Sequence, residues 1–491
     1  MTAIVKSDIP KEVILVAETL ENAGYEAYLV GGCVRDLLID KTPKDWDITT
    51  NARPEQIEGL FEETYKNNDF GTIGVVQETE DERLKVIEIT PYRIESGYAD
   101  ARRPDEVVFS DSLEDDLKRR DFTINAIAYS VSHETVVDNF EGMLDIREKR
   151  IRAVGKPEER LAEDALRMMR AVRLAVELNF VIDTETLNAI AKNASNLQRI
   201  SKERIRDEFI RILNSDNPMQ GIILCEKLGL LASIAPDILR GIGVEQNQAH
   251  AYHVYEHLLR TLQHAADKKW PFHVRLAALF HDVAKPETRR WSEEKKNWTF
   301  YGHDVVGARV TRKALMALKF PRETVELVSN LVRWHMFFSD PDAITLSAVR
   351  RTIQNIGPEY IDDLLNLRVC DRIGTGRPKE HPFRFRKYKA MVEEALRDPI
   401  SVKMLSIDGS RIMEVTDEKP GPKLGYALHA LLEEVLDDPT KNTPEYLEER
   451  AIELMRMPET ALQTLGKQGK NTRTREEENA LRIIQQKHHV A

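Results

Sequence analysis

The sequence predicts an α+β protein in which a head with a small mixed sheet precedes a long all-helical region. Two patterns predict this class. Residues 1–154 alternate short β-branched runs with short helical patterns, whereas beyond about residue 155 the apolar positions recur at helical spacing. The length supports it, because 491 residues at roughly 100–200 per domain make three or four domains.

The composition is that of a globular protein, with 42% hydrophobic and 31% charged residues. A net charge of −11 argues against a surface coated in positive charge but leaves room for a local basic groove. Cys33, Cys225 and Cys370 lie far apart without a CxxC pair, so we expect neither a disulfide framework nor a zinc knuckle. This cysteine usage fits a reducing cytoplasm.

The N-terminal sequence lacks the pattern of a signal peptide, and no apolar run approaches the ~20 residues needed to cross a bilayer. We therefore expect a cytoplasmic protein without a membrane segment. The sequence does not set the oligomeric state.

The head is expected to begin with a helix, a strand and a second helix, with Gly31 and Gly32 between the last two. A glycine turn there lets backbone N–H groups approach a phosphate at the helix N-terminus, and Arg35 can reach the same anion. A glycine pair alone is weak evidence. In chain order we expect helices over 10–23, 33–39 and 53–61 and strands over 27–30, 46–49, 72–78 and 84–92.

Two carboxylates follow the glycine pair closely, Asp45 and Asp47. On a strand, side chains at i and i+2 point to one face. Like charges held on one face are unfavourable unless a cation lies between them, so the pair predicts a divalent metal site. An isolated pair of this kind is usually a surface turn, but the glycine turn before it favours the metal interpretation.

Three further motifs carry a resemblance to a known family. They are Arg119-Arg120-Asp121-Phe122-Thr123-Ile124-Asn125-Ala126, then Asp138 with Gly142, Asp145 and Arg147, then Glu163-Asp164 with Arg167, Arg170 and Arg173. Together with the glycine turn and the acidic pair, this order resembles the class II tRNA nucleotidyltransferases of the polymerase-β superfamily. That family includes CCA-adding enzymes and relatives that add only A, add only CC, or make poly(A). The match covers roughly residues 25–215.

The resemblance implies phosphoryl transfer in the head by a two-metal mechanism with Mg²⁺. Asp45 and Asp47 would be the catalytic metal ligands. Glu88, in a predicted strand, is a candidate third carboxylate, with a solvent-facing strand residue as the alternative. The residues implied to hold the nucleotide's triphosphate or sugar are Gly32, Arg35 and Arg120, and Asn125 is implied to reach the ribose.

Asp164 and Arg167 predict how a base could be chosen without a template strand. At i and i+3 on a helix they would lie on one face. Cytosine and adenine both present an amine donor beside a ring-nitrogen acceptor, which an Asp acceptor beside an Arg donor matches. Uracil and guanine present the inverse pattern. The resemblance also assigns Arg170 and Arg173 to nucleotide binding; the alternative for the whole row is an ion-paired helix face.

A second constellation consists of histidines and aspartates in the order His257, His281-Asp282, His303, His335 and Asp371. Imidazoles and carboxylates are good ligands for divalent transition metals. The ordered set resembles the HD phosphohydrolase superfamily, which implies a bound Mn²⁺, Ni²⁺, Co²⁺ or Mg²⁺ and hydrolysis of small phosphate esters or 2′,3′-cyclic phosphates.

The helical region has four amphipathic segments, then the histidine-bearing stretch 250–372, which we also expect to be helical, and a last helical region interrupted near residue 420. The four segments are 160–178, 181–197, 202–214 and 219–232. We expect four domains: a nucleotidyltransferase head (1–154), a nucleotide-selecting and RNA-binding neck and body (155–248), an HD domain (249–375) and a tRNA-binding tail (376–491).

The predicted function is template-independent addition of CCA to tRNA 3′ ends from CTP and ATP, with a second hydrolase site. The implied partner is tRNA, held by its acceptor and T arms through contacts that need no base-reading motif. A segment from Tyr92 to Asp116 resembles the loop of relatives that add the final A. The alternatives are an enzyme of the same family that adds only A or makes poly(A), and, from another class, an HD regulatory hydrolase or RNA-binding scaffold with an idle head.

Overall fold

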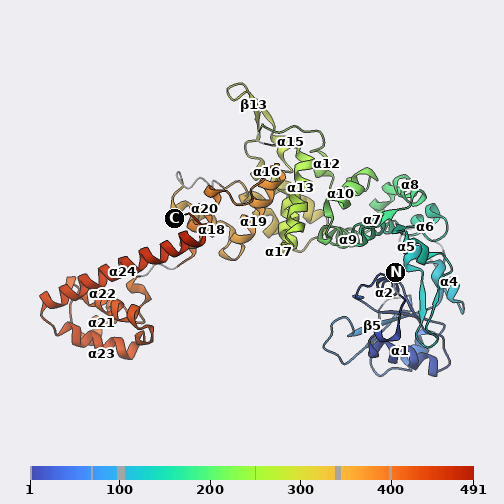
Figure 1. Ribbon diagram of the computed structural model, residues 1–491, viewed down its shortest axis with the longest axis horizontal. Helices are drawn as coiled ribbons and strands as arrows, with labels where there is room; N and C mark the ends of the chain where they lie inside the picture. The colour runs from blue at the N-terminus through green and yellow to red at the C-terminus, as the bar shows by residue number, and fades with distance from the viewer. Residues whose placement is uncertain are drawn as a thin grey trace. The chain divides into compact units, whose positions relative to one another are not determined.

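The computed structural model describes residues 3–67, 70–96, 106–248, 250–337, 344–397 and 401–490. The chain forms two compact units (Figure 1). The first contains residues Met1–His335 and Asn366–Pro378, and the second contains Met336–Leu365 and Lys379–Ala491. Of the loop segment 92–116 singled out above, residues 97–105 lie outside the described residues.

The head is built on a seven-stranded sheet with strand order β3-β4-β5-β2-β1-β8-β9. Only the β2–β5 pair is parallel within this sheet, and its other neighbours are antiparallel, so the predicted small mixed sheet is confirmed. The strands are β1 (Tyr28–Val30), β2 (Asp47–Thr50), β3 (Thr64–Lys66), β4 (Ile73–Val76), β5 (Val86–Pro91), β8 (Ala128–Ser130) and β9 (Thr135–Val137).

Alternation along β5 decides which side chains face the core. Ile87 and Ile89 are fully buried, whereas Glu88 between them is only half-buried on the other face. A separate hairpin of β6 (Arg93–Ser96) and β7 (Glu106–Phe109) follows. The helices of the head are α1 (Lys11–Asn22), α2 (Gly32–Leu38), α3 (Pro54–Glu58), α4 (Leu113–Lys118) and α5 (Gly142–Arg147), with a short 3-10 turn at Thr123–Asn125.

The rest of the first unit is mostly helical. Two residue pairs, Arg150↔Val181 and Ile151↔Ile182, join β10 (Arg150–Ile151) to β11 (Val181–Ile182). The helices are α6 (Pro157–Glu163), α7 (Leu166–Leu178), α8 (Thr184–Asn193), α9 (Lys202–Asn214), α10 (Pro218–Lys227), α11 (Leu231–Ile234), α12 (Pro236–Leu239), α13 (Val254–Asp267), α14 (Phe272–Phe280), α15 (Lys285–Thr288), α16 (His303–Ala317) and α17 (Arg322–Trp334).

The prediction of one helix over residues 160–178 is wrong. The chain forms α6 and α7 with a break at Asp164, whose backbone is extended. The carboxylate of Asp164 accepts a hydrogen bond from the backbone N–H of Leu166 at 3.0 Å, in the first turn of α7. A short acidic side chain competes with helical hydrogen bonds in a helix interior but satisfies free N–H groups at a helix start, and this favours the break.

The expectation that residues 250–372 are all helical is also wrong at one place. Residues Arg290–Ser292 and Asn297–Thr299 form the antiparallel strands β12 and β13. Between them lies a four-residue turn rich in Glu and Lys, residues that are also common in helices, so the composition misleads. The strand signal is the pair Trp291 and Trp298, which stand opposite each other across the hairpin.

The second unit is helical. Its helices α22 and α24 pack closely, because Gly466 and Gly469 let α24 approach the backbone of α22 at Tyr426 and His429. The helices are α18 (Leu346–Ile356), α20 (Phe383–Leu396), α21 (Gly409–Thr416), α22 (Pro422–Asp437), α23 (Pro444–Met455) and α24 (Glu459–Lys487), while α19 (Ile361–Gly374) contributes residues to both units. Within the described ranges, no helix is both long and apolar enough to span a bilayer.

The crossing of α22 and α24 gives a direct test of this packing. A Cβ on Gly469 would lie 2.1 Å from the carbonyl oxygen of His429, so Gly469→Val should destabilise the second unit by about 1–3 kcal/mol. Gly425→Ala, on α22 where an added Cβ would meet nothing within 4 Å, should instead be neutral or stabilising. Urea unfolding monitored by circular dichroism compares the two; equal midpoints would contradict the close crossing.

Candidate functional sites

Three acidic side chains gather at the start of β2. Asp47 opens the strand, and its partner in the parallel β2–β5 register is Glu88. Asp45 precedes the strand in a bend and is exposed. Burial, together with the Asp45 and Glu88 carboxylates, raises the pKa of Asp47 to about 7. Burial and Asp45 likewise raise the pKa of Glu88, although Asn67 donates a hydrogen bond to it at 2.9 Å. Such mutual repulsion is what a divalent cation relieves.

A glycine turn with two arginines lies against these acids; we call Gly31, Gly32, Arg35 and Arg120 the cradle. Gly31 has a φ of +82°, and a Cβ there would meet an Arg120 guanidinium nitrogen at 3.1 Å and an Asp47 carboxylate oxygen at 3.6 Å. A Cβ on Gly32 would meet Arg35 at 3.7 Å and Asp45 at 3.8 Å. Glycine therefore keeps the turn open between carboxylates and guanidinium groups. This arrangement can hold a metal ion and an anion such as a triphosphate side by side.

Arg120 is positioned by a buried acid, Asp116. Asp116 is fully buried and pairs with Arg119 at 2.6 Å and with Arg120 at 3.0 Å. Arg119 also reaches Glu95 on β6 at 3.1 Å. The Nε of Arg120 is buried and makes no hydrogen bond to any described residue. That unused donor fits an anionic ligand in the cradle.

A hydrogen-bonded chain runs from the cradle to α7. Arg35 donates to Asn125 at 2.6 Å, Asn125 donates to Asp121 at 3.0 Å, and Arg170 donates to Asp121 at 2.7 Å. Burial opposes ionisation of Asp121, but Arg170 and Asn125 outweigh it and hold the pKa of that carboxyl well below its usual range. Asp121, which the sequence did not single out as a site residue, therefore links the head to the neck helix.

Asp164 and Arg167 were predicted to face one way on a single helix, but Asp164 lies in the α6–α7 break and Arg167 lies in the first turn of α7. Asp164 pairs with Arg204 of α9 at 2.7 Å. Arg167 pairs with Glu163 at 2.5 Å and also donates to the carbonyl of Arg119 at 3.2 Å. Both side chains have protein partners, and their base-selecting role stays a prediction.

Arg173 lies deeper in the same helix. It is 4% exposed and pairs with Glu177 at 2.9 Å and Glu208 at 2.7 Å. These partners belong to the helical region rather than to the acidic cluster of the head. Its surroundings match the ion-paired alternative for this row of arginines, and a role in nucleotide binding stays a prediction.

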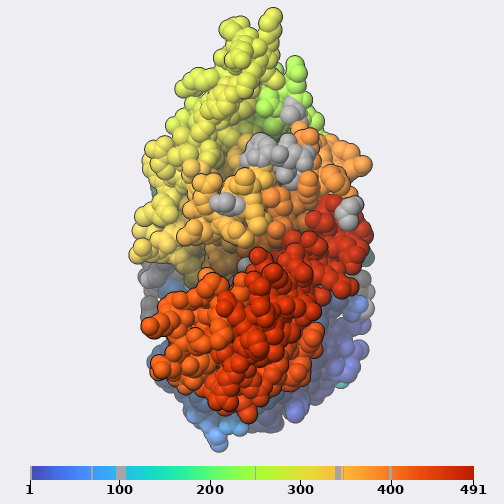
Figure 2. Space-filling view, turned by 90° about the vertical axis from the view of Figure 1, so that its left-hand side faces the viewer, coloured from blue at the N-terminus to red at the C-terminus, as the bar shows by residue number. Residues whose placement is uncertain are grey.

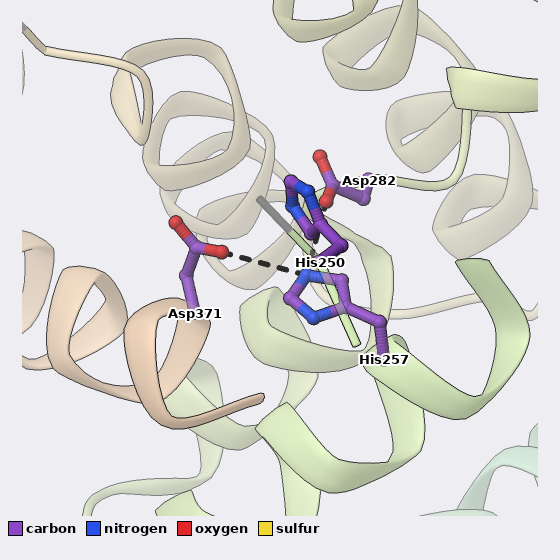
Figure 3. Close-up of side chains that lie close together, drawn as sticks. All are labelled: His250, His257, Asp282 and Asp371. Carbon is purple, nitrogen blue, oxygen red and sulfur yellow. Dashed lines mark ion pairs between the residues drawn. The ribbon is translucent and has the colours of Figure 1, made fainter. Parts of the chain in front are cut away.

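The second constellation comes together from several helices and their ends. His257 lies on α13, His281 and Asp282 follow α14, His303 begins α16, His335 follows α17, and Asp371 lies on α19. His257 Nε2 lies 3.1 Å from Asp282 and 3.4 Å from Asp371 (Figure 3). All six predicted residues are therefore brought together in one buried cluster.

The histidine rings are oriented by the backbone. The Nδ1 atoms of His281, His303 and His335 lie 2.9, 2.6 and 2.6 Å from the carbonyl oxygens three residues earlier, to which they donate. Each ring therefore turns its Nε2 atom into the cluster. His303 Nε2, His335 Nε2 and Asp282 Oδ1 are buried and make no hydrogen bond to the part of the chain that is described. Lone pairs that converge without donors fit a metal ion.

Ligand atoms in the cluster form two groups, each within 4.8 Å. One is His250, His257, Asp282 and Asp371, and the other is Asp282, His303 and His335. His250 was missed in the sequence because it precedes the first histidine of the familiar pattern. Burial and nearby Lys285 lower the pKa of His250 to about 3, so this ring is a neutral potential ligand.

Lys285 is a second residue that the sequence analysis missed. Its ammonium contacts Asp282 at 2.5 Å and Gln246 at 2.6 Å, and lies 3.3 Å from His250 Nε2. Lys285 thus supplies a fixed positive charge beside the carboxylate that both ligand groups share. The sequence signal would have been its position three residues after Asp282.

Three family models match separate parts of the chain. The family model "Poly A polymerase head domain" matches residues 27–152, "Probable RNA and SrmB- binding site of polymerase A" matches 179–241, and "HD domain" matches 254–371. The fold and the two sites thus define a nucleotidyltransferase with an HD domain.

Relatives make the family specific. The CCA-adding enzyme of Lactobacillus helveticus is 34% identical over 446 residues, which cover 90% of this chain and 96% of that enzyme. The CCA-adding enzyme of Limosilactobacillus reuteri is 48% identical over 208 residues, covering 42% of this chain and 50% of that enzyme. The chain belongs to the CCA-adding enzyme family.

Solved structures share the fold. The Bacillus stearothermophilus CCA-adding enzyme in complex with CTP aligns with a TM-score of 0.59 at 27% identity, over 90% of this chain and 96% of that one. The Thermotoga maritima CCA-adding enzyme complexed with tRNA aligns with a TM-score of 0.50 at 18% identity, over 91% of this chain and 97% of that one.

The ion pair between Asp121 and Arg170 should make stability depend on pH. Because the folded pKa of Asp121 is depressed, its contribution is present above the ordinary Asp pKa of about 3.9 and is lost as the pH falls further. Asp121→Asn should lower the free energy of unfolding by about 1–3 kcal/mol at pH 7. This range is reduced for solvent screening of the ion pair, because the Arg170 side chain is 35% exposed.

Thermal unfolding of the wild type and Asp121→Asn at pH 7 and pH 2.5 measures this effect. The wild type and Asp121→Asn should differ less in the temperature of their first unfolding transition at pH 2.5 than at pH 7. Asp111→Asn, at a side chain 82% exposed, should change little at either pH. A difference that stays constant with pH would refute the ionised pair.

Proposed function

We propose that this protein adds C, C and A to the 3′ ends of tRNA from CTP and ATP without a nucleic-acid template. The observation that carries the proposal is the acidic cluster of Asp45, Asp47 and Glu88 against the Gly31–Gly32 cradle, in a chain of the CCA-adding enzyme family. CTP in the complex of the Bacillus stearothermophilus relative supports the choice of substrate. An enzyme that adds only A or makes poly(A) is not favoured, because the relatives named above are CCA-adding enzymes.

In the head, the residues of this chain bind and align the reactants. Asp45 and Asp47 would hold Mg²⁺, with Glu88 beside them, and Mg²⁺ when bound would activate the 3′-hydroxyl and neutralise charge on the transferred phosphate. Arg35 and Arg120 lie where a triphosphate would need positive charge. Asn125, held between Arg35 and Asp121, is placed to contact the ribose.

Base selection is assigned to Asp164 and Arg167. An acceptor and a donor presented together pair with cytosine or adenine and reject uracil or guanine. In the structure these side chains pair with Arg204 and Glu163. The proposal therefore requires that an incoming base share or replace those partners.

The remaining parts are assigned to RNA. The neck and body are proposed to select the nucleotide and bind RNA, and the tail to hold the acceptor and T arms of tRNA, within the four-domain division predicted above. Contacts with the phosphate backbone of RNA weaken as the salt concentration rises. A cytoplasmic location follows from a tRNA substrate and from three buried thiols.

Nucleotide addition by Asp47→Asn tests the head. We expect at least a ~100-fold loss of CMP and AMP incorporation, because the variant removes a metal-binding charge at the reacting phosphate. Asp40→Asn is the matched control: Asp40 is exposed, and its φ of +58° suits asparagine. The substrates are tRNA ending before C74, after C75 and after A76, with radiolabelled CTP and ATP offered separately.

The nucleotides added to each tRNA distinguish CCA addition from A-only addition and from poly(A) synthesis. CMP added to the shortest tRNA and AMP to the one ending after C75 supports CCA addition. AMP without CMP indicates an A-only enzyme, and long adenylate tails indicate poly(A) synthesis. Full activity of Asp47→Asn contradicts the metal assignment.

The histidine cluster is proposed to be a metal-dependent phosphohydrolase that uses Mn²⁺, Ni²⁺, Co²⁺ or Mg²⁺. Its ligand atoms would be the Nε2 atoms and carboxylates described above, and the bound metal would supply an activated water for attack on a phosphate ester. Lys285 would place positive charge next to Asp282.

Loss of a single ligand tests this second site. His303→Ala should lower metal content and cut hydrolysis of bis(p-nitrophenyl) phosphate at least ~10–100-fold. Exposed His133 lies in the head, so His133→Ala is the control. Elemental analysis and a colorimetric assay with each metal are the measurements. No turnover by the wild type with any of the four metals would reduce the cluster to a structural site.

A further inference from the structure

The hairpin that the sequence analysis missed joins two parts of the histidine cluster. We call residues 289–301 the aromatic hairpin; they contain β12, β13 and the residues flanking them. In the chain it follows Asp282 and Lys285 and precedes His303. Figure 1 shows it projecting from α15, and Figure 2 shows it as a yellow-green protrusion. Neither proposed activity uses it.

The base of the aromatic hairpin is fixed to the cluster. Phe300 is buried, and its carbonyl oxygen lies 2.6 Å from Nδ1 of His303, the ring nitrogen that orients this candidate ligand. The Lys285 ammonium lies 5.5 Å from the centre of the Phe300 ring. The same residue therefore supports the hairpin and two members of the cluster. A molecule bound along the hairpin would have one end near the cluster.

The body of the hairpin is internally braced. Trp291 and Trp298 stand opposite each other, with ring centres 5.2 Å apart and nearly perpendicular planes. The Arg289 guanidinium lies 3.7 Å from the centre of the Trp298 ring. These contacts hold flat rings in place on the strands.

Two large rings on the hairpin remain exposed to solvent. Trp291 is 48% exposed and Tyr301 is 74% exposed. Around them the hairpin carries four basic residues, Arg289, Arg290, Lys295 and Lys296, and only Glu293 and Glu294 as acids. It also holds two of the five tryptophans of a chain whose net charge is −11. Arg289 pairs with Glu245 at 3.4 Å, so Arg290, Lys295 and Lys296 are the basic residues that supply positive charge beside the exposed rings.

Unpaired nucleotides are the ligand that this chemistry fits best. Exposed aromatic rings bind the faces of bases irrespective of sequence, and basic side chains follow the phosphates. A protein partner would favour a contiguous apolar patch, whereas charged residues interrupt the rings here. Complementary charge favours a polyanion.

We propose that the aromatic hairpin stacks the unpaired nucleotides of an RNA end and so presents a terminal phosphate ester to the histidine cluster. The proposal rests on the hydrolase activity proposed above and adds the surface that would hold its substrate. For a terminal 2′,3′-cyclic phosphate, the oxygen of water forms a new P–O bond and one ring P–O bond breaks. The released ribose hydroxyl gains a proton, and a terminal phosphate monoester remains.

Comparison of a large and a small substrate tests the proposal. The large substrate is an eight-nucleotide oligoadenylate ending in a 2′,3′-cyclic phosphate, which has no 3′-hydroxyl for the head to extend. The small one is bis(p-nitrophenyl) phosphate. In the double variant Trp291→Ala, Tyr301→Ala, the ratio of kcat/KM for the oligonucleotide to kcat/KM for the small ester should fall about tenfold.

Two controls define what the loss means. Trp291→Phe, Tyr301→Phe keeps flat rings and should restore most of the ratio. Met316→Ala, at a 60% exposed side chain on α16, should leave the ratio unchanged. An unchanged ratio in the double alanine variant overturns the proposal and assigns the rings to another kind of partner, such as a protein.

A separate measurement covers failure of the hydrolase proposal itself. If the wild type hydrolyses neither substrate with any metal, the same oligoadenylate with 4-thiouridine at its last position is crosslinked to the protein by ultraviolet light. Crosslinked peptides from residues 289–301 support the hairpin as an RNA-binding surface. Crosslinks found only elsewhere overturn it.

Discussion

The parallel pairing of β2 with β5 holds Asp47 directly beside Glu88, and the chemistry of the head depends on this one register. Burial, together with the charges of Asp45 and Glu88, raises the pKa of Asp47, and a bound metal ion would favour its ionised form. A slip by one residue would turn Asp47 to the other face of the sheet and separate the carboxylates. The fully buried Ile48 and Ile89 secure the register from the core side.

Around this acidic cluster, positive charge is placed by other buried acids. Asp116 holds Arg119 and Arg120, and Asp121 joins Asn125 of the head to Arg170 of α7. The histidine cluster follows a related principle, since backbone carbonyls fix three of its rings, and the Nε2 atoms of His303 and His335 meet a carboxylate oxygen of Asp282 that accepts no hydrogen bond from the described residues. In the head, a bound metal ion would relieve the repulsion between the carboxylates. In the histidine cluster, it would give the converging ligand atoms a shared partner.

The sequence predicted much of this because local patterns and chemistry agree. The order of short strands and helices, the acidic pair after a glycine turn and the spaced histidines each reflect a nearby constraint. The sequence did not predict the features that depend on contacts between residues far apart in the chain. Asp164 accepts a hydrogen bond from the N–H of Leu166 at the start of α7 and pairs with Arg204 forty residues away, which no helical period reveals. His250 joins the cluster through folding of segments distant in the chain. Lys285 was missed although it lies three residues after Asp282, and the hairpin was missed because its turn is rich in charged residues.

Anomalous diffraction from crystals containing Mn²⁺ and a non-hydrolysable CTP analogue locates the metal and the nucleotide in the head together. We expect a peak within coordination distance of Asp45 and Asp47, with the analogue's triphosphate between that peak and Arg120. A triphosphate bound elsewhere, or one bound in the cradle with no metal peak at these carboxylates, would contradict this expectation.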